Sequence, residues 1–167
     1  MDFTITRMED QDFVTFHKWY KDPAYAPFFR HTPKGLTIDE LKIVFTIMGI
    51  VIRVDTPDSR MAAVVTVAAN SDTQIADVGV MVDKDLRRQR IGEHITRKTL
   101  HYLFTEGTVD RVIMYATEPT TIAALKRGGF FEECRMHKNA FYNGKLHNES
   151  RLVMTKSFYQ KTNNIKE

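Results

Sequence analysis

Apolar and polar residues alternate along several stretches of the chain, a pattern typical of half-buried β-strands. Alternation of this kind predicts an opening strand at residues 3–8, "FTITRM". Longer apolar runs, separated by the turn-rich segments "TPDSR" and "NSDT", predict three consecutive strands. These three strands span 50–55, 60–69 and 75–83, and a further strand is predicted at 111–117.

The end of the chain has the pattern of a β-hairpin. Asn143–Gly144 separates two long strand-like segments, 130–142 and 145–158, and this dipeptide favours a two-residue turn. Residues 159–167 are mostly polar, so we expect them to form a flexible tail.

Helical spacing of apolar residues marks the remaining elements. Residues 11–20 place Phe13, Phe16 and Tyr20 on one helical face. Thr37 and Glu40 have the spacing of a capping box, which predicts a helix from there to Gly49. Further helices are predicted after Gly92 and at 119–129, and the segment 21–35, with three of the five prolines, is predicted to be a loop.

The predicted order is strand, two helices, three strands, helix, strand, helix and two strands. This order indicates an α/β protein of the α+β type. At 167 residues, 43% of them hydrophobic, the chain fits a single domain, 1–167, with a substantial core.

Composition bears on the cellular compartment in which the protein is expected. Apolar runs are shorter than a membrane span and the N-terminus lacks the layout of a secretory signal, so we expect no membrane association. Cys134 is the only cysteine, which excludes an intramolecular disulfide and a thiolate zinc site. A cytoplasmic, reducing compartment fits best, and we expect Cys134 to be a small buried hydrophobe.

Charge points weakly to an anionic ligand. The formal net charge is +3 and the pI is about 9.0, which suits a negatively charged small molecule or partner. Ordinary surface lysines and arginines explain the same numbers. Nucleic acid is not expected as a partner, because no nucleic-acid-binding motif accompanies the charge.

The segment "LRRQRIG", residues 86–92, places three arginines where a predicted strand gives way to a helix. Unpaired main-chain N–H groups and the helix dipole make such a helix start favourable for phosphate. The side chains of Arg87, Arg88 and Arg90 would strengthen the attraction, and Gly92 would let the backbone approach closely. The alternative is an exposed basic turn without a ligand.

Spacing around this turn resembles a known family. "VGVMVDKDLRRQRIGEHI" is similar to the acetyl-CoA-binding segment of the GNAT superfamily of N-acetyltransferases, with Arg87 at the Gln/Arg position and Gly92 at the final glycine. "RVIMYATEPTTIAALKRGGFFEE" resembles the following strand, loop and helix of the family, and "NAFYNGKLHNESRLVM" its closing hairpin. The resemblance covers about residues 75–154.

The resemblance implies a central mixed, mostly antiparallel sheet of about seven strands, with helices on both faces and two strands splayed at the cofactor site. It implies acetyl-CoA as acetyl donor and no metal. The strand that carries Val80 and Val82 would bind pantetheine through its main chain. The diphosphate would be held mainly by N–H groups of the next turn, which comprises Arg87, Arg88, Gln89, Arg90, Ile91 and Gly92.

Three residues depart from the family pattern. Arg90 replaces the first motif glycine: with a helical backbone its guanidinium would reach phosphate, whereas a positive φ there would displace the cofactor. Glu118 replaces the loop asparagine. Leu125 stands where many members have a tyrosine that protonates the leaving thiolate, and leucine cannot donate a proton.

Glu118 and Asp77 are the candidate general bases, and each has the alternative of a solvated surface carboxylate. Tyr115 and Tyr142 are candidate thiolate acids, with plain strand packing as the alternative. The aromatic residues between Phe13 and Phe29 belong to the segment that lines the acceptor side in the family. Most of them should be core.

The favoured function is acetyl-CoA-dependent transfer of an acetyl group to a primary amine: a protein N-terminus, a lysine or a small amine. The alternative, favoured by the three departures, is a catalytically impaired GNAT-fold protein that acts as a binding, regulatory or assembly component, for example in a virion or complex. A homodimer or a place in a protein complex is compatible with either.

Overall fold

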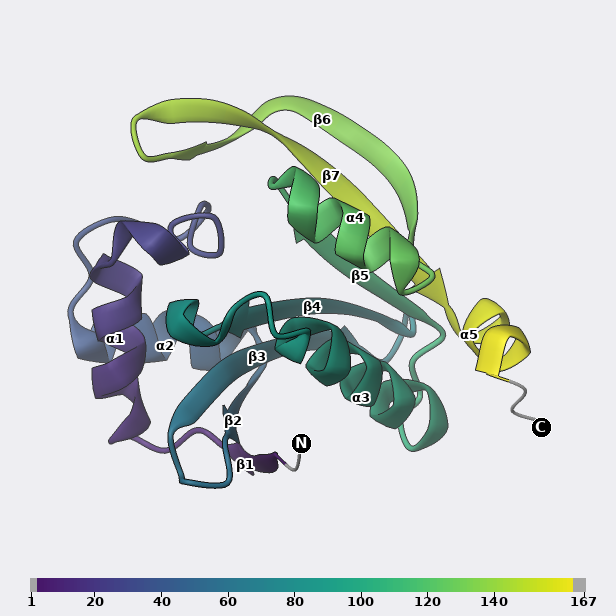
Figure 1. Ribbon diagram of the computed structural model, residues 1–167, viewed down its shortest axis with the longest axis horizontal. Helices are drawn as coiled ribbons and strands as arrows, with labels where there is room; N and C mark the ends of the chain where they lie inside the picture. The colour runs from purple at the N-terminus through teal and green to yellow at the C-terminus, as the bar shows by residue number, and fades with distance from the viewer. Residues whose placement is uncertain (1–2, 164–167) are drawn as a thin grey trace.

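The computed structural model describes residues 3–163. This part of the chain contains seven strands and five α-helices (Figure 1). The seven strands and the first four α-helices follow the predicted order, and the fifth α-helix is an addition at the end. The elements are β1 (Thr4–Arg7), α1 (Asp12–Lys21), α2 (Ile38–Met48), β2 (Ile50–Asp55), β3 (Met61–Asn70), β4 (Ile75–Val82), α3 (Ile91–Thr105), β5 (Arg111–Ala116), α4 (Pro119–Arg127), β6 (Phe131–Tyr142), β7 (Lys145–Thr155) and α5 (Lys156–Asn163). Short 3-10 turns occur at η1 (Pro23–Tyr25) and η2 (Lys84–Leu86).

All seven strands form one sheet in the order β1-β2-β3-β4-β5-β7-β6. Every neighbouring pair is antiparallel except β4 and β5, which run parallel. The parallel pair needs a crossover, and α3 provides it. The expected mixed, mostly antiparallel sheet is therefore confirmed.

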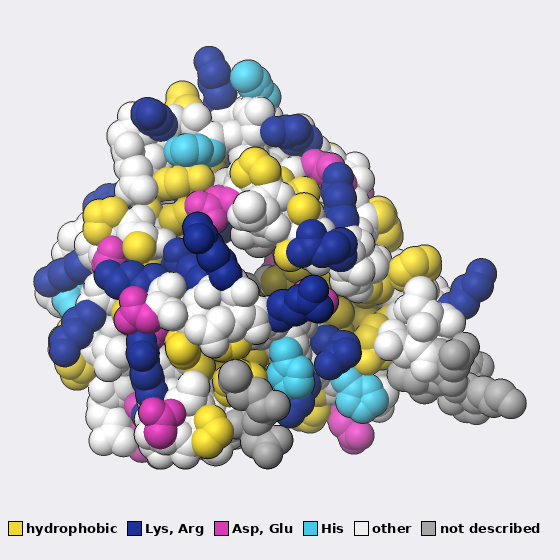
Figure 2. All heavy atoms as spheres, viewed as in Figure 1, with side chains coloured by type: hydrophobic (Ala, Val, Ile, Leu, Met, Phe, Trp, Pro, Cys, Tyr) yellow, Lys and Arg dark blue, Asp and Glu magenta, His cyan; other side chains and the backbone are white. Residues whose placement is uncertain are grey.

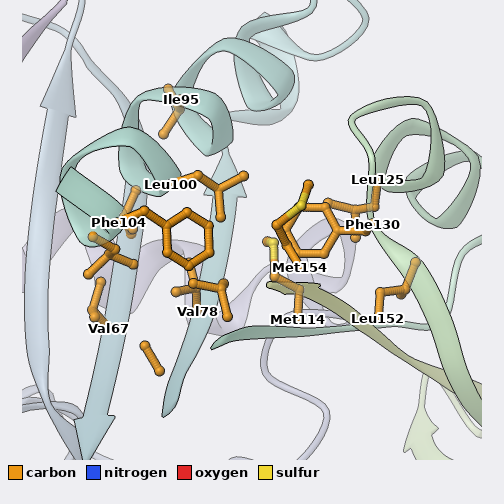
Figure 3. Close-up of a cluster of buried hydrophobic side chains, with 14 of the residues drawn as sticks. Val67, Val78, Ile95, Leu100, Phe104, Met114, Leu125, Phe130, Leu152 and Met154 are labelled. Atoms are coloured by element: carbon orange, nitrogen blue, oxygen red, sulfur yellow. The ribbon is translucent and has the colours of Figure 1, made fainter. Parts of the chain in front are cut away.

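Helices cover both faces of the sheet. On one face α3 and α4 lie over a core that includes Val67, Val78, Leu100, Phe104 and Phe130 (Figure 3). On the other face α1 and α2 pack mainly aromatic side chains against β2, β3 and β4. This second cluster contains Phe13, Phe16, Trp19, Tyr25, Phe29, Leu41, Phe45, Val51, Met61, Val64 and Met81.

The predicted helix cap and hairpin turn are both present in the structure. The capping box forms as predicted: the Glu40 N–H donates to the Thr37 hydroxyl and the Glu40 carboxylate accepts from the Thr37 N–H. Asn143 and Gly144 both have positive φ, 49° and 74°, which is what a two-residue hairpin turn with matching twist requires.

Two expectations need correction. Residues 156–163 form α5 rather than a strand end and flexible tail, because Tyr159 is buried against Phe104 with ring centroids 5.2 Å apart. Residues 164–167 of the predicted tail lie outside the described residues. Cys134 is exposed rather than buried, since it lies on the edge strand β6. Within residues 3–163, every helix is too short or too polar to cross a membrane.

Candidate active site

Strand β4 is bound very differently on its two sides. With β3 it pairs at eight positions, from Ile75 to Val82, whereas its pairing with β5 is confined to three, ending at Asp77 and Ile113. Beyond these residues the two strands part, and Figure 1 shows them diverging. The sheet therefore has the V-shaped opening that the resemblance implied, with its closed end at Asp77.

The main chain of Val80 and Val82 faces this opening. The Arg87 Nε donates to the Val82 carbonyl at 3.2 Å from the open side, while the Asp83 N–H donates to the Ala62 carbonyl at 2.8 Å on the β3 side. Because peptide groups alternate in direction along a strand, Val80 presents its N–H and C=O to the same side as Val82. Val80 can thus pair with an extended ligand lying in the gap.

Helix α3 begins at the wide end of the opening. Its first intrahelical bond runs from the His94 N–H to the Arg90 carbonyl at 3.0 Å, and within the described chain the N–H groups of Ile91, Gly92 and Glu93 have no main-chain acceptor. A Cβ on Gly92 would lie only 3.3 Å from a Val82 methyl group. The glycine therefore lets the free N–H groups of the helix lie directly beside the end of β4.

Arg90 adopts the left-handed conformation, with φ 58° and ψ 14° at the N-cap of α3. Arg88 also has a positive φ, 66°. A non-glycine residue in this region costs about 1–2 kcal/mol, so the turn stores strain that a glycine would release. Of the two backbone conformations considered for Arg90, the positive-φ one is present, which is the one expected to displace the cofactor. Both side chains are exposed, and the Arg90→Gly variant described in the Discussion tests whether Arg90 obstructs the site or reaches the diphosphate.

Arg87 is engaged within the protein. Besides Val82, its guanidinium donates to the Ala24 carbonyl at 2.9 Å and lies 4.8 Å from the centre of the Tyr25 ring. These contacts tie the end of β4 to η1. Arg87 can serve a diphosphate through its main chain and long-range charge, whereas Arg88 and Arg90 have side chains free to reach it. Figure 2 shows the face of the molecule hollowed near its centre, with Lys and Arg side chains around the hollow.

Asp77 lies at the closed end of the V, on the face that carries α1 and α2. Its neighbours Ala76 and Val78 belong to the α3-side core, so the side chain between them points to the opposite face. The Asp77 side chain is exposed, but the protein around it removes part of its water. This raises the pKa of the Asp77 carboxyl above its ordinary 3.8, and the positive charge of Arg151 offsets part of the rise. A carboxylate with a raised pKa is better matched to proton abstraction.

Tyr115 and Arg151 stand on the same face, two residues beyond the closed end. They are cross-strand partners on β5 and β7. Partial burial and the negative charge of Asp77 raise the pKa of the Tyr115 hydroxyl, which keeps it protonated. The opening thus has a carboxylate and a phenol on opposite walls. Tyr142, the other tyrosine considered, is buried and its hydroxyl lies 3.0 Å from the Thr117 hydroxyl.

Glu118 lies at the other end of the opening. It is the exposed N-cap of α4, without a side-chain capping bond. It is five positions beyond Ile113, the partner of Asp77, and β5 ends at Ala116, so the two positions are up to about 16 Å apart along the chain. The structure therefore does not bring the two candidate bases together, and only Asp77 is near the closed end.

A loop at residues 22–31, here called the crossing loop, spans the opening on the α1–α2 face. Near its start the Tyr25 hydroxyl accepts from the Lys84 N–H at 3.0 Å, next to the end of β4. In the same part of the loop, Asn143 of the hairpin turn donates to the Pro23 carbonyl at 3.3 Å. Further along the loop, the Phe28 ring would lie 3.1 Å from a Cβ on Gly79, so that ring rests directly on β4.

Glu149 fixes the crossing loop to β7. This carboxylate is only 1% exposed and accepts hydrogen bonds from the Arg30 Nε, the His31 Nε2 at 3.0 Å and the Asn139 Nδ2 at 2.6 Å. Burial pushes the pKa of Glu149 upward, but the His31 bond, the Arg30 charge and the Asn139 bond outweigh it, so that the pKa lies below the ordinary 4.5.

Sequence reasoning missed Glu149, Arg30 and Arg151. Arg30 and Glu149 are 119 residues apart, and neither lies in a motif. The one available signal was a glutamate at a position in β7 that would otherwise be apolar core. Leu125, in contrast, is buried in the α3-side core as its residue type suggests, so it contributes packing rather than a proton.

Comparison with known proteins supports the fold. No protein-family model matches the sequence, and no curated protein matches it significantly. The fold resembles that of spermidine N-acetyltransferase from Vibrio cholerae in complex with CoA and spermine, with a TM-score of 0.85, 16% identity, and coverage of 94% of this chain and 97% of that one. A dodecameric structure of spermidine N-acetyltransferase from Vibrio cholerae gives a TM-score of 0.79 at 14% identity, with 98% of each chain covered. At these identities the likeness shows a shared GNAT-like fold.

Proposed function

We propose that this protein is an acetyl-CoA-dependent N-acetyltransferase that acetylates an amine by direct attack. The observation that carries the proposal is the V-shaped opening between β4 and β5, with the free N-terminus of α3 at its wide end and Asp77 at its closed end. A solved structure with the same fold binds CoA together with an amine, spermine, which supports CoA and an amine acceptor here.

The residues present fit acetyl-CoA. The N–H groups of Ile91, Gly92 and Glu93 would bind the diphosphate, assisted by the side chains of Arg88 and Arg90. The main chain of Val80 would hold the pantetheine arm in the gap. When bound, acetyl-CoA supplies the thioester acetyl group that the amine accepts.

Asp77 is the favoured general base for this reaction. The diphosphate site lies at the wide end of the opening, so a ligand extended along β4 has its far end near Asp77 rather than near Glu118. From there Asp77 would take the proton of the ammonium group, directly or through a water molecule. Tyr115 would donate a proton to the leaving thiolate, a role that buried Leu125 cannot fill.

Cofactor binding is tested by thermal unfolding with acetyl-CoA. A ligand at about one hundred times its dissociation constant stabilises the folded protein by about 2.7 kcal/mol. Replacing Arg88 and Arg90 together by alanine should reduce the shift. The matched control is the double replacement Lys18→Ala and Lys21→Ala, which removes the same charge from exposed positions on α1. An unchanged shift in the Arg88/Arg90 variant, or no shift at all, would contradict the proposed site.

A second function is favoured by one observation, the apolar residue Leu125 at the position where the family resemblance places a proton donor. In that case the protein would bind CoA as a regulatory or assembly component without turnover. Thiol release from acetyl-CoA across a panel of amines separates the two functions. Cofactor binding without amine-dependent thiol release would favour the second one.

Self-association is a separate proposal. The hairpin exposes Phe131, Phe141 and Leu146, each about half accessible, and β6 is an edge strand. A dimer or larger assembly through this edge would cover them. Analytical ultracentrifugation tests this, and a monomer at micromolar concentration would contradict it.

A further inference from the structure

Carboxylates on the α1–α2 face differ in whether they are already paired with cationic side chains of the protein. Glu149 is saturated by its three donors from the crossing loop and the hairpin. Glu133 is shared by two guanidinium groups, those of Arg111 and Arg151. Neither carboxylate is therefore available to bind a cationic ligand.

Asp77 is different. Within residues 3–163 its carboxylate has no ion pair and no hydrogen bond, although it lies at the closed end of the opening. The Phe28 ring packs on Gly79, two positions beyond Asp77 on the same face of β4. Tyr115 lies across the opening on β5. A carboxylate between aromatic rings is suited to bind one ammonium group.

The wall across the opening from Asp77, on β5, β7 and β6, carries net positive charge. Arg151 is two strands away and two residues further along, about 12 Å between main chains, and its long side chain shortens this distance. Since one Glu133 carboxylate faces two guanidinium groups, that part of the wall keeps a net positive charge. A second ammonium group on the acceptor would meet this charge, whereas a carboxylate would be attracted to it.

We infer that the acceptor is an amine with a single ammonium group, bound at Asp77, whose next charged group is anionic and faces Arg151. The inference rests on the proposed function and narrows its substrate class. It also separates this chain from the spermidine N-acetyltransferases that share its fold, whose polyamine acceptors carry several positive charges.

The test uses three amines of equal length and different tail charge: δ-aminovalerate, pentylamine and cadaverine. Binding of each to the CoA-saturated protein is measured by calorimetry, so the result does not depend on turnover. We expect δ-aminovalerate to bind most tightly and cadaverine most weakly. The difference between them should be about tenfold, since the tail charge changes by two units, from −1 to +1, in a largely solvated site.

Variants of Arg151 test whether its charge causes the difference in binding among the three amines. Arg151→Gln should reduce the difference among the three amines to less than about twofold, and Arg151→Lys, which keeps the charge, should preserve the order. Arg135→Gln is the matched control: Arg135 is exposed on the same hairpin but pairs with Ser150 on the opposite face. It should leave the order and the differences unchanged.

Two results would overturn the inference. One is binding of cadaverine as tight as, or tighter than, binding of δ-aminovalerate. The other is the absence of binding by all three amines to the CoA-saturated protein. Failure of the proposed function is distinct, because it would be seen as the absence of acetyl-CoA binding in the thermal measurement.

Discussion

The proposed site has two parts that are built differently: the turn before α3, and the wall formed by the crossing loop, β5 and β7. The turn at Arg87–Gly92 is made from consecutive residues and the helix that follows them. The wall opposite is assembled from the crossing loop, β5 and β7, and its central bond joins Arg30 to Glu149 across 119 residues. One side is encoded locally and the other by packing.

That difference implies that the two sides can be damaged separately. Variants in the turn should change acetyl-CoA binding and leave the crossing loop in place, apart from Arg87, which belongs to both. Variants in the wall should change acceptor binding or folding and leave the cofactor site intact. The variants below test this separation.

The largest effect is expected at Asp77. Asp77→Asn should lower amine-dependent thiol release about a hundredfold or more, since a general base contributes at least that much. Acetyl-CoA binding should persist. Glu118→Gln, at the other end of the opening, is the comparison variant and should retain most of the rate. A larger loss in this variant than in Asp77→Asn would reverse the assignment.

The pH profile gives a second measurement of the same group. Because partial loss of water raises the pKa of Asp77, the rate should fall on acidification at a higher pH than for a fully solvated carboxylate of pKa 3.8. The profile of kcat/KM reports this pKa in the free enzyme.

The next largest effect is expected on stability, at Glu149. Glu149→Gln leaves the buried Arg30 without its carboxylate, which should cost about 3–5 kcal/mol in the free energy of unfolding, measured with denaturant. Glu132→Gln is the matched control on the neighbouring strand. Glu132 is more accessible and pairs with Lys126, so its loss should cost about 1 kcal/mol or less.

The same carboxylate should make stability pH-dependent. Its pKa is depressed in the folded protein, so its contribution is present above the unfolded value of about 4.5 and is lost as pH falls through the folded pKa. Glu149→Gln should remove this part of the acid dependence. An identical acid profile for variant and parent would show that Glu149 does not carry it.

These variants also mark what the sequence could predict. The strands, the capping box and the Asn143–Gly144 turn depend on neighbours in the chain, and the structure confirms them. The α5 helix was missed because Tyr159 is buried by Phe104, a contact across the fold that no local pattern encodes. Glu149 and Arg151 were missed for the same reason. The left-handed Arg90 was undecidable because arginine is rarely found there and only the packed turn imposes it.

A smaller effect is expected at Arg87, which connects the two sides. Arg87→Ala removes its bonds to the Val82 and Ala24 carbonyls and its contact with the Tyr25 ring, and should cost about 1–2 kcal/mol of unfolding free energy. Hydrogen exchange should also rise in the crossing loop. Arg97→Ala, at an exposed position on α3, should change stability by less than about 0.5 kcal/mol. Equal effects of the two variants would contradict the bridging role.

The smallest effect is expected at Arg90, and it has opposite signs for folding and binding. Arg90→Gly releases left-handed strain of about 1–2 kcal/mol but adds freedom to the unfolded chain, so the net gain should be about 0.5–1 kcal/mol. Acetyl-CoA affinity should fall a few-fold, because a guanidinium near the diphosphate is lost. Arg90→Ala loses the same charge and keeps the strain, so it should bind acetyl-CoA like Arg90→Gly without its added stability. If Arg90→Gly instead binds more tightly than the parent, the arginine obstructs the site, and the strained turn is better explained by a role other than phosphate binding.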